Sequence, residues 1–377
     1  MNPIQFIFTA DDYGPIPFVN EGILHHVRQG SINSVQVLPN METDELEESL
    51  FHLWQAVPVG KTLDLGVHLT LTSGRPLYKR EEGEAEVKKA WKQMVEKGYD
   101  GHYYFRAYTR FYVKYMHPSN EGERESYQKA ISSEFELQKT ALLNAVARVN
   151  ALQGEERLVV TSVSNHQNIL TTSHDLFNRY TDVVTVDLAI RSPKMAPKSS
   201  GSLYYGAVLP VLGRNDYREY NRTMRKLYRH FSKNSYYDGE EGVTLKTPSF
   251  IDVRFYNSLG SVAKGNVSPR KIRGRKLKFR NMVEHAYHVY ERAEADPDHP
   301  TPLTVETVFH LGKLTTPFTS YSALSMKKYP GVTHKYFDNR LVEFHALDQV
   351  RKEGRFDEVF NQLVSWKNCS SIVYKKE

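Results

Sequence analysis

The sequence predicts an α/β protein in which strands and helices alternate, arranged as a (β/α) barrel. Short runs rich in β-branched residues recur along the chain, and most are followed by a segment with helical periodicity. Polar residues with catalytic potential stand at the ends of these runs, where the loops of a barrel converge. The chain has 377 residues, which suits one large domain with insertions.

Six strands and two early helices follow from these patterns. We expect strands over residues 4–9, 34–38, 63–71, 158–164, 183–190 and 303–309. A helix over 20–29 is predicted by Val19, Ile23 and Val27 at four-residue spacing, with Gly30 as its C-cap. A second helix over 44–56 carries an apolar stripe that includes Leu46 and Leu50.

Two long segments interrupt this alternation of strands and helices. Residues 81–154 are charged and Tyr-rich and are expected to be mostly helical, whereas residues 194–246 are richer in Gly, Ser and Tyr, with a helix around 217–231. Neither an internal repeat nor a strong linker is found. We therefore interpret both as insertions into a single catalytic domain that spans residues 1–377.

Composition excludes several classes of protein. The single cysteine, Cys369, excludes an intrachain disulfide and a Cys-rich zinc cluster. The net charge of +6 is too mild to indicate nucleic-acid binding. No apolar run approaches the eighteen residues of a membrane span, and the first residues lack the basic region of a signal peptide. We expect a cytoplasmic globular protein, with the oligomeric state, a homo-oligomer included, left open.

Chemically active residues end nearly every predicted strand, and they come from five separate segments. They are Asp11 and Asp12, His68, His166, Arg191 and His310. In known barrels such strand-end residues gather at one active site. For this chain that gathering is inferred by analogy, since the barrel itself is predicted from the sequence pattern.

The histidines and aspartates suit a divalent metal. His68 lies on the small polar face of an alternating strand, Leu65 to Thr72, where a ligand can approach. Two histidines and one carboxylate from separate strand ends leave open positions for water and substrate. Of Asp11 and Asp12, one carboxylate can bind the metal while the other takes a proton. The alternatives are buried, hydrogen-bonded histidines and an Asp-Asp pair that serves only turn or N-cap chemistry.

Five segments carry a recognisable pattern: FTADDYGPIPFVNEGILHHVRQGSINSVQVLPN, LDLGVHLTLTSGRPL, SVSNHQNIL, AIRSP and FHLG, the last followed by a helix with Arg340 and Glu343. Together they resemble the YdjC-like carbohydrate deacetylases. They occur in the family's order across residues 3–78, 158–193 and about 303–350. The resemblance implies a distorted barrel of the deacetylase type that removes acetyl groups from N-acetylated sugars or oligosaccharides.

The resemblance also implies roles for the strand-end residues. Asp11 would be the general base, and Asp12, His68 and His166 would bind one divalent ion, Mg²⁺ or Zn²⁺. Histidine titrates near neutrality, so His310 is the candidate acid that protonates the leaving amine. Arg191 is expected to orient Asp11 or grip the sugar, or else to form a surface salt bridge. Arg340 and Glu343, three apart on a helix, are interpreted as a structural pair.

The sequence departs from the family pattern in one segment. Where the family-like motif reads DSHQHVH, this chain has Ser164, Asn168 and Leu170 in place of the aspartate and the last two histidines. His166 is retained, so three metal ligands remain. The loss of a carboxylate beside the metal leaves open a second function, a degenerate member that binds a glycan without hydrolysing it.

Other readings concern the charged and aromatic segments. Residues 264–280 hold eight Lys or Arg and no acid. We interpret them as a solvated loop, or as a border of the cleft that favours anionic glycans, and nucleic-acid binding is not favoured. The insertion's aromatic residues could stack on sugar rings or form a packing face; they are Tyr103, Tyr104, Phe105, Tyr108, Phe111, Tyr112 and Tyr115. A phosphoester hydrolase would need more carboxylates than these segments offer.

Overall fold

A computed structural model describes most of the strands and helices of the chain. It describes residues 4–78, 85–98, 101–106, 120–166, 189–190, 244–246, 250–252, 267–293, 303–314, 334–368 and 371–373.

A seven-stranded parallel sheet forms the centre of the molecule. Its strands are β1 (Ile4–Tyr13), β2 (Ser34–Val37), β3 (Leu63–Leu69), β6 (Leu158–Asn165), β7 (Ala189–Ile190), β9 (Phe250–Asp252) and β10 (Leu303–Phe309). Their order across the sheet is β7-β6-β3-β2-β1-β10-β9, and every neighbouring pair is parallel. The expected α/β fold with a parallel sheet is confirmed.

Neighbouring strands in the sheet follow one another along the chain, except that β1 also lies beside the late strand β10. The first strand, β1, pairs with β2 on one side and with the late strand β10 on the other, with Ile4 opposite Leu303. A (β/α) barrel joins its first and last strands in this way. In the described residues, however, β7 and β9 are edges that do not pair with each other. Closure of the sheet is therefore not confirmed.

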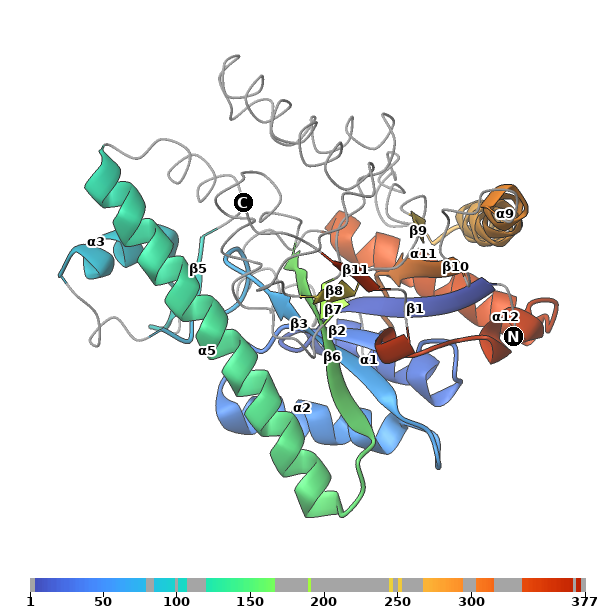
Figure 1. Ribbon diagram of the computed structural model, residues 1–377, viewed down its shortest axis with the longest axis horizontal. Helices are drawn as coiled ribbons and strands as arrows, with labels where there is room; N and C mark the ends of the chain where they lie inside the picture. Colours follow the sequence, from blue (N-terminus) through green and yellow to red (C-terminus); the bar gives the residue numbers. More distant parts are fainter. Residues whose placement is uncertain are drawn as a thin grey trace.

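Helices form a layer along the sheet, neighbour against neighbour (Figure 1). The main helices are α1 (Pro17–Arg28), α2 (Thr43–Ala56), α5 (Glu121–Gln153), α9 (Pro269–Ala293) and α11 (His334–Lys352). They pack in the order α9, α11, α1, α2, α5, and this order follows that of the strands they connect. Steps in one direction along a sheet, each right-handed, place the crossover helices on the same face.

The remaining elements are short. They are α3 (Ala85–Met94), α12 (Asp357–Asn361), the 3₁₀ turn Trp366–Asn368, and two antiparallel strand pairs, β4 (Val95–Lys97) with β5 (Tyr103–Phe105) and β8 (Thr244–Lys246) with β11 (Ser371–Val373).

The described part of residues 81–154 is dominated by the 33-residue helix α5. The side chain of Asn120 accepts a hydrogen bond from the Glu123 N–H (2.9 Å), and Gly154 ends the helix in the left-handed conformation. The segment is mostly helical, as predicted, but Tyr103 to Phe105 form a strand. Phe105 is buried and its ring meets that of Trp91 edge-on at 5.7 Å, so it belongs to the packing face. Tyr108, Phe111, Tyr112 and Tyr115 lie outside the described residues.

Several predicted boundaries shift for identifiable reasons. β10 has the predicted bounds, whereas β1 continues past residue 9 to Tyr13 and so includes both aspartates. α1 begins at Pro17, three residues early, because proline suits the first turn of a helix. The basic stretch 264–280 is not a loop throughout: from Pro269 it forms the first half of α9. The predicted helix 217–231 and most of strand 183–190 lie outside the described residues.

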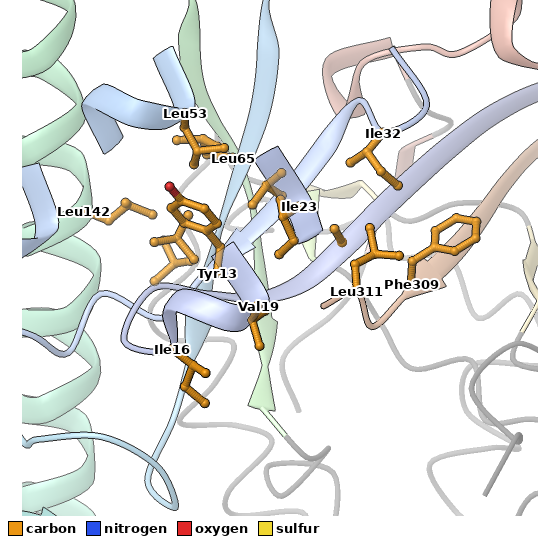
Figure 2. Close-up of a cluster of buried hydrophobic side chains, with 14 of the residues drawn as sticks. Tyr13, Ile16, Val19, Ile23, Ile32, Leu53, Leu65, Leu142, Phe309 and Leu311 are labelled. Atoms are coloured by element: carbon orange, nitrogen blue, oxygen red, sulfur yellow. The ribbon is translucent and has the colours of Figure 1, made fainter. Parts of the chain in front are cut away.

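Apolar side chains of the sheet and helices make one continuous core. Figure 2 shows part of it, where Tyr13 of β1 lies near Leu53 of α2, Leu142 of α5 and Leu65 of β3. The buried Tyr13 hydroxyl donates to the Ser49 carbonyl (2.7 Å), which ties the end of β1 to α2. Within the described part of the chain, none of the helices has the length and apolar character needed to cross a bilayer.

Candidate active site

A bulge at the end of β1 brings the two adjacent aspartates into one site. The register of β1 against β2 shifts between Ala10 and Tyr13, and Asp12 adopts a positive φ of 71°. Aspartate is one of the few residues that tolerate this conformation. In a regular strand the two carboxylates would point to opposite faces. With the bulge, Asp12 faces His68 and His166, and Asp11 Oδ2 lies 3.9 Å from His310 Nε2.

Asp12 and the two histidines form the most closely spaced part of the site. Asp12 Oδ1 lies 3.1 Å from His68 Nε2 and 3.5 Å from His166 Nε2. The histidines come from the paired strands β3 and β6, where His68 is opposite Ser164, and their rings meet edge-on at 5.5 Å. All three side chains are nearly removed from solvent, with exposed fractions of 5%, 2% and 12% for Asp12, His68 and His166.

These distances fit a metal only in part. Four ligands at about 2.0–2.2 Å from a zinc ion lie about 3.3 Å from one another, a spacing that both Asp12–histidine distances approach. Yet no three His, Cys, Asp or Glu side chains among the described residues are already arranged to hold an ion. The residue types and two of the spacings therefore fit a divalent ion, and the side chains would have to adjust to surround it.

Arg340 from α11 completes the environment of Asp12. Its Nη2 donates to Asp12 Oδ2, in an ion pair with both side chains 5% exposed. Arg340 was expected to form a structural pair with Glu343, and its guanidinium also reaches the predicted site. Burial by itself would raise the pKa of Asp12, but the charges of Arg340 and His166 hold it well below its usual value.

The protonation states at the site are those that metal ligands require. Asp12 is ionised, and burial lowers the pKa of His166 to about 4 despite the opposing charge of Asp12. His166 is then neutral near pH 7 and has a lone pair to offer. A carboxylate and a neutral imidazole are the forms that bind a divalent ion.

His310 lies on the rim at the end of β10 and is the most exposed of the predicted aspartates and histidines, with a quarter of its side chain exposed. Its backbone N–H donates to Glu343 Oε2 (2.7 Å), and Glu343 also pairs with Arg275 of α9 (3.5 Å). Burial and the charge of Arg340 lower the pKa of His310, with the nearby carboxylates opposing. The ring is therefore mostly neutral near pH 7.

The segment after His310 is held by close contact with α1. A Cβ on Gly312 would lie 2.1 Å from a ring carbon of Phe18, and one on Gly22 would lie 2.6 Å from the Gly312 nitrogen. The Lys313 N–H donates to the Phe18 carbonyl (2.9 Å). Only glycine allows this approach, which fixes the rim two residues beyond His310.

Helix α5 contacts the loop after β3, which in turn contacts His166. Gln138 pairs with the backbone of Thr70 in both directions: Nε2 donates to Thr70 O (2.8 Å), and Oε1 accepts from Thr70 N (3.0 Å). The hydroxyls of Thr70 and Thr72 each lie 3.3 Å from His166 Nδ1. Glu134, one turn before Gln138, accepts from the N–H groups of Leu77 and Tyr78. Helix α5, in the described part of residues 81–154, therefore braces the loop that contacts His166.

Sequence reasoning found five of these residues and missed others. Asp11, Asp12, His68, His166 and His310 are brought together as predicted. Arg191 lies outside the described residues. Gln138 and Glu134 could have been found as polar residues on the buried stripe of α5. Gln36 is, with Ser34, one of the two polar residues of the short buried strand β2.

Fold and site together define a class: a parallel α/β protein with two aspartates and three histidines gathered at the carboxyl ends of its strands. The chain belongs to the YdjC-like protein family, whose sequence profile matches residues 5–351.

Curated relatives match a segment that makes up about a fifth of the chain. Carbohydrate deacetylase of Clostridium beijerinckii is 36% identical over 76 residues, which are 20% of this chain and 29% of that protein. Carbohydrate deacetylase 1 of Listeria innocua is 40% identical over 77 residues, 20% of this chain and 28% of that protein. The matched segment thus spans less than a third of the length of these relatives.

A solved structure supports the fold over nearly the whole chain. A protein of Enterococcus faecalis V583, whose name refers to the cleavage of cellobiose phosphate, superposes with a TM-score of 0.52 over 96% of this chain and 97% of that one. The two are 17% identical. At that identity the likeness concerns the fold alone.

Proposed function

We propose that the protein is a carbohydrate deacetylase that hydrolyses the acetamido group of an N-acetylated sugar or oligosaccharide. The observation that carries the proposal is the meeting of Asp11, Asp12, His68, His166 and His310 at the carboxyl ends of β1, β3, β6 and β10. The family and the names of the relatives support the substrate class.

We infer that Asp12, His68 and His166 hold one divalent ion, Mg²⁺ or Zn²⁺. The ionised carboxylate and the neutral ring of His166 suit it, and Asp12 Oδ1 is the oxygen directed at both histidines. A bound ion there would supply Lewis-acid polarisation of the acetyl carbonyl and activation of water. Arg340 holds the other oxygen of Asp12 and so orients the carboxylate.

The protein's own groups would move the protons. Water adds to the acetyl carbon, Asp11 accepts its proton, and the C–N bond breaks to give acetate and an amine. Because the pKa of His310 is lowered, its ring is neutral at the start. We propose that the proton passes from Asp11 to His310 and on to the departing amine. Asp11 Oδ2 and His310 Nε2 are 3.9 Å apart, which a side-chain rotation or one water can span.

We also propose that the sheet closes into the distorted barrel. The pairing of β1 with β10 supports closure, because it sets the first strand beside the last.

The test is stoichiometric. The protein is incubated with a panel of N-acetylated mono- and oligosaccharides, and acetate and free amine are both quantified, with a chelator-treated sample as the control. Equal amounts of acetate and amine, lost on chelation and restored by a divalent ion, are the expected result. Saturable binding of the glycans without acetate release would overturn the proposal in favour of a glycan-binding protein.

A further inference from the structure

Polar side chains from three adjacent strands meet behind His68, on the side away from Asp12. They are Gln36 of β2, Ser162 and Ser164 of β6, and His68 itself on β3, and each is at most 2% exposed. Buried polar groups are costly unless they are hydrogen-bonded, so their partners define the arrangement.

The hydrogen bonds of this cluster have one direction. Gln36 Nε2 donates to Ser162 Oγ (3.1 Å), which leaves Gln36 Oε1 as an acceptor for the Ser164 hydroxyl (2.5 Å). A serine hydroxyl has one hydrogen, and here it points to Gln36. Ser164 Oγ, 2.7 Å from His68 Nδ1, can then only accept, so Nδ1 carries the ring hydrogen.

A glycine makes room for this contact. Gly66 lies on β3 opposite Gln36 of β2, and a Cβ there would fall 2.0 Å from Gln36 Oε1 and 2.2 Å from Nε2. Because Gly66 has no side chain, the amide of Gln36 packs flat against the strand.

A hydrogen on Nδ1 of His68 determines the state of the other ring nitrogen, Nε2. With hydrogen on Nδ1, a neutral ring presents a lone pair at Nε2, and this atom faces Asp12 Oδ1 at 3.1 Å. Two acceptors face each other there, an arrangement that a cation between them would satisfy. Ser164 stands where the family-like segment DSHQHVH has aspartate. The Ser164 hydroxyl, held by the Gln36 amide, therefore accepts the hydrogen bond from His68 that a carboxylate could accept.

We propose that Gln36 and Ser164 are positioning residues that hold His68 in the Nδ1–H form, so that its Nε2 lone pair is directed at the Asp12 side of the site. The inference deepens the proposed function, on which its metal-binding consequence rests, but the tautomer itself does not depend on turnover.

Nitrogen NMR of the full chain tests the tautomer. The protein is labelled with ¹⁵N-histidine, dialysed against a chelator and studied near pH ~8, where an ordinary histidine is neutral. His68, assigned from the spectrum of His68→Gln, is expected to show a protonated Nδ1 and a bare Nε2. Ser164→Ala and Gln36→Met should each produce a mixture of tautomers. Ser126→Ala, which removes a buried serine hydroxyl from α5, should leave His68 unchanged.

Metal affinity gives the second readout. Ser164→Ala is expected to weaken binding of Zn²⁺ about 10–100-fold, as loss of a group that orients a ligand does, and Ser164→Asp should retain it. A protonated Nε2 in the wild type would overturn the proposal, as would an unchanged tautomer and an unchanged affinity in Ser164→Ala. If the predicted tautomer and affinities are found but no N-acetylated sugar is hydrolysed, the proposed function fails and this inference stands.

Discussion

At the scale of single residues, Asp12 is where the charges of the site meet. One of its oxygens faces the two histidines and the other accepts from Arg340, all with little exposure to solvent. A buried ion pair adds little net stability over apolar residues of the same size. Removal of one partner is costly, however, because the other charge remains buried and unpaired.

We therefore expect Arg340→Met to lower the free energy of unfolding by about 3–5 kcal/mol. Asp12→Asn/Arg340→Met should be less destabilised than the sum of the two single variants, since the double variant leaves no unpaired charge. Urea unfolding of the four proteins measures the difference. Additive losses would show that the pair is not coupled as the structure indicates.

The residues that could be predicted share one property: they end strands. Asp11, Asp12, His68, His166 and His310 each follow a recognisable apolar run, so local pattern was sufficient. Arg340 lies on a helix more than 300 positions from Asp12, and only the folded chain brings the two together. The direction of the Gln36–Ser164–His68 hydrogen bonds likewise depends on three strands being adjacent.

At the scale of elements, α5 acts as a brace for the loop after β3. The side-chain amide of Gln138 pairs with the Thr70 backbone as a neighbouring strand would. Thr70 in turn lies against His166. Through this loop, α5 supports the position of a predicted metal ligand, His166.

Gln138→Leu should cost about 1–3 kcal/mol of stability, because the buried N–H and carbonyl of Thr70 lose their partners. We also expect weaker metal binding, since the contact of Thr70 with His166 is loosened. The same substitution at the exposed Gln153, on the last turn of α5, is the matched control. Thermal unfolding measures the stability of the two variants, and equilibrium dialysis measures their affinity for Zn²⁺. Equal stability and equal affinity in the two variants would show that the contact of Gln138 with Thr70 has no such role.

The contact of the rim with α1 gives a second prediction for elements. Gly312→Ala would press a methyl group into Phe18 and should destabilise the protein by about 1–3 kcal/mol, with slower acetate release because His310 is displaced. Gly274→Ala in α9 meets nothing within 4 Å and should stabilise by about 0.5–1 kcal/mol through helix propensity. Stability and rate are measured for both variants; opposite signs are the expected outcome, and a neutral Gly312→Ala would contradict the packing.

How well each element could be predicted depended on how local its signals are. The bounds of β10 follow from an apolar run alone. The C-terminal end of β1 could not be predicted from an apolar run, because the part of the strand with two adjacent aspartates is stabilised only by its neighbours and by the bulge. The ring-like strand order was expected only by analogy with barrels, because the pairing of β1 with β10 spans most of the chain and leaves no local pattern in the sequence.

At the scale of the whole molecule, stability should depend on pH through buried groups other than the predicted catalytic and metal-binding residues. His26 on α1 is fully buried, with Nε2 3.2 Å from the Phe344 carbonyl of α11. Burial, together with the charges of His25 and Lys313, lowers its pKa to about 3, although Phe344 and Asp348 oppose the shift. Burial also raises the pKa of Asp64 to about 6 and of Glu134 to about 7, and these two act in the opposite direction.

The contribution of His26 is isolated by His26→Gln, which keeps a donor for Phe344 but does not titrate. Between about pH 6.5 and pH 3 the unfolded chain binds a proton at His26 that the folded protein excludes. Stability from this group is thus present above the unfolded pKa and lost as pH falls. Free energies of unfolding across this range should fall more steeply for the wild type, by up to about 1.4 kcal/mol per pH unit. Parallel curves would disprove the assignment.

Asp11 is proposed to act as a base beside a metal held by Asp12, His68 and His166. The most direct measurement is the rate of acetate release by Asp11→Asn, compared with the wild type at equal metal content and with Asp12→Asn as the metal-binding control. We predict that Asp11→Asn keeps its metal while kcat falls by about 10²–10⁴-fold, and that Asp12→Asn loses metal affinity. An unchanged kcat in Asp11→Asn with full metal content would contradict the account.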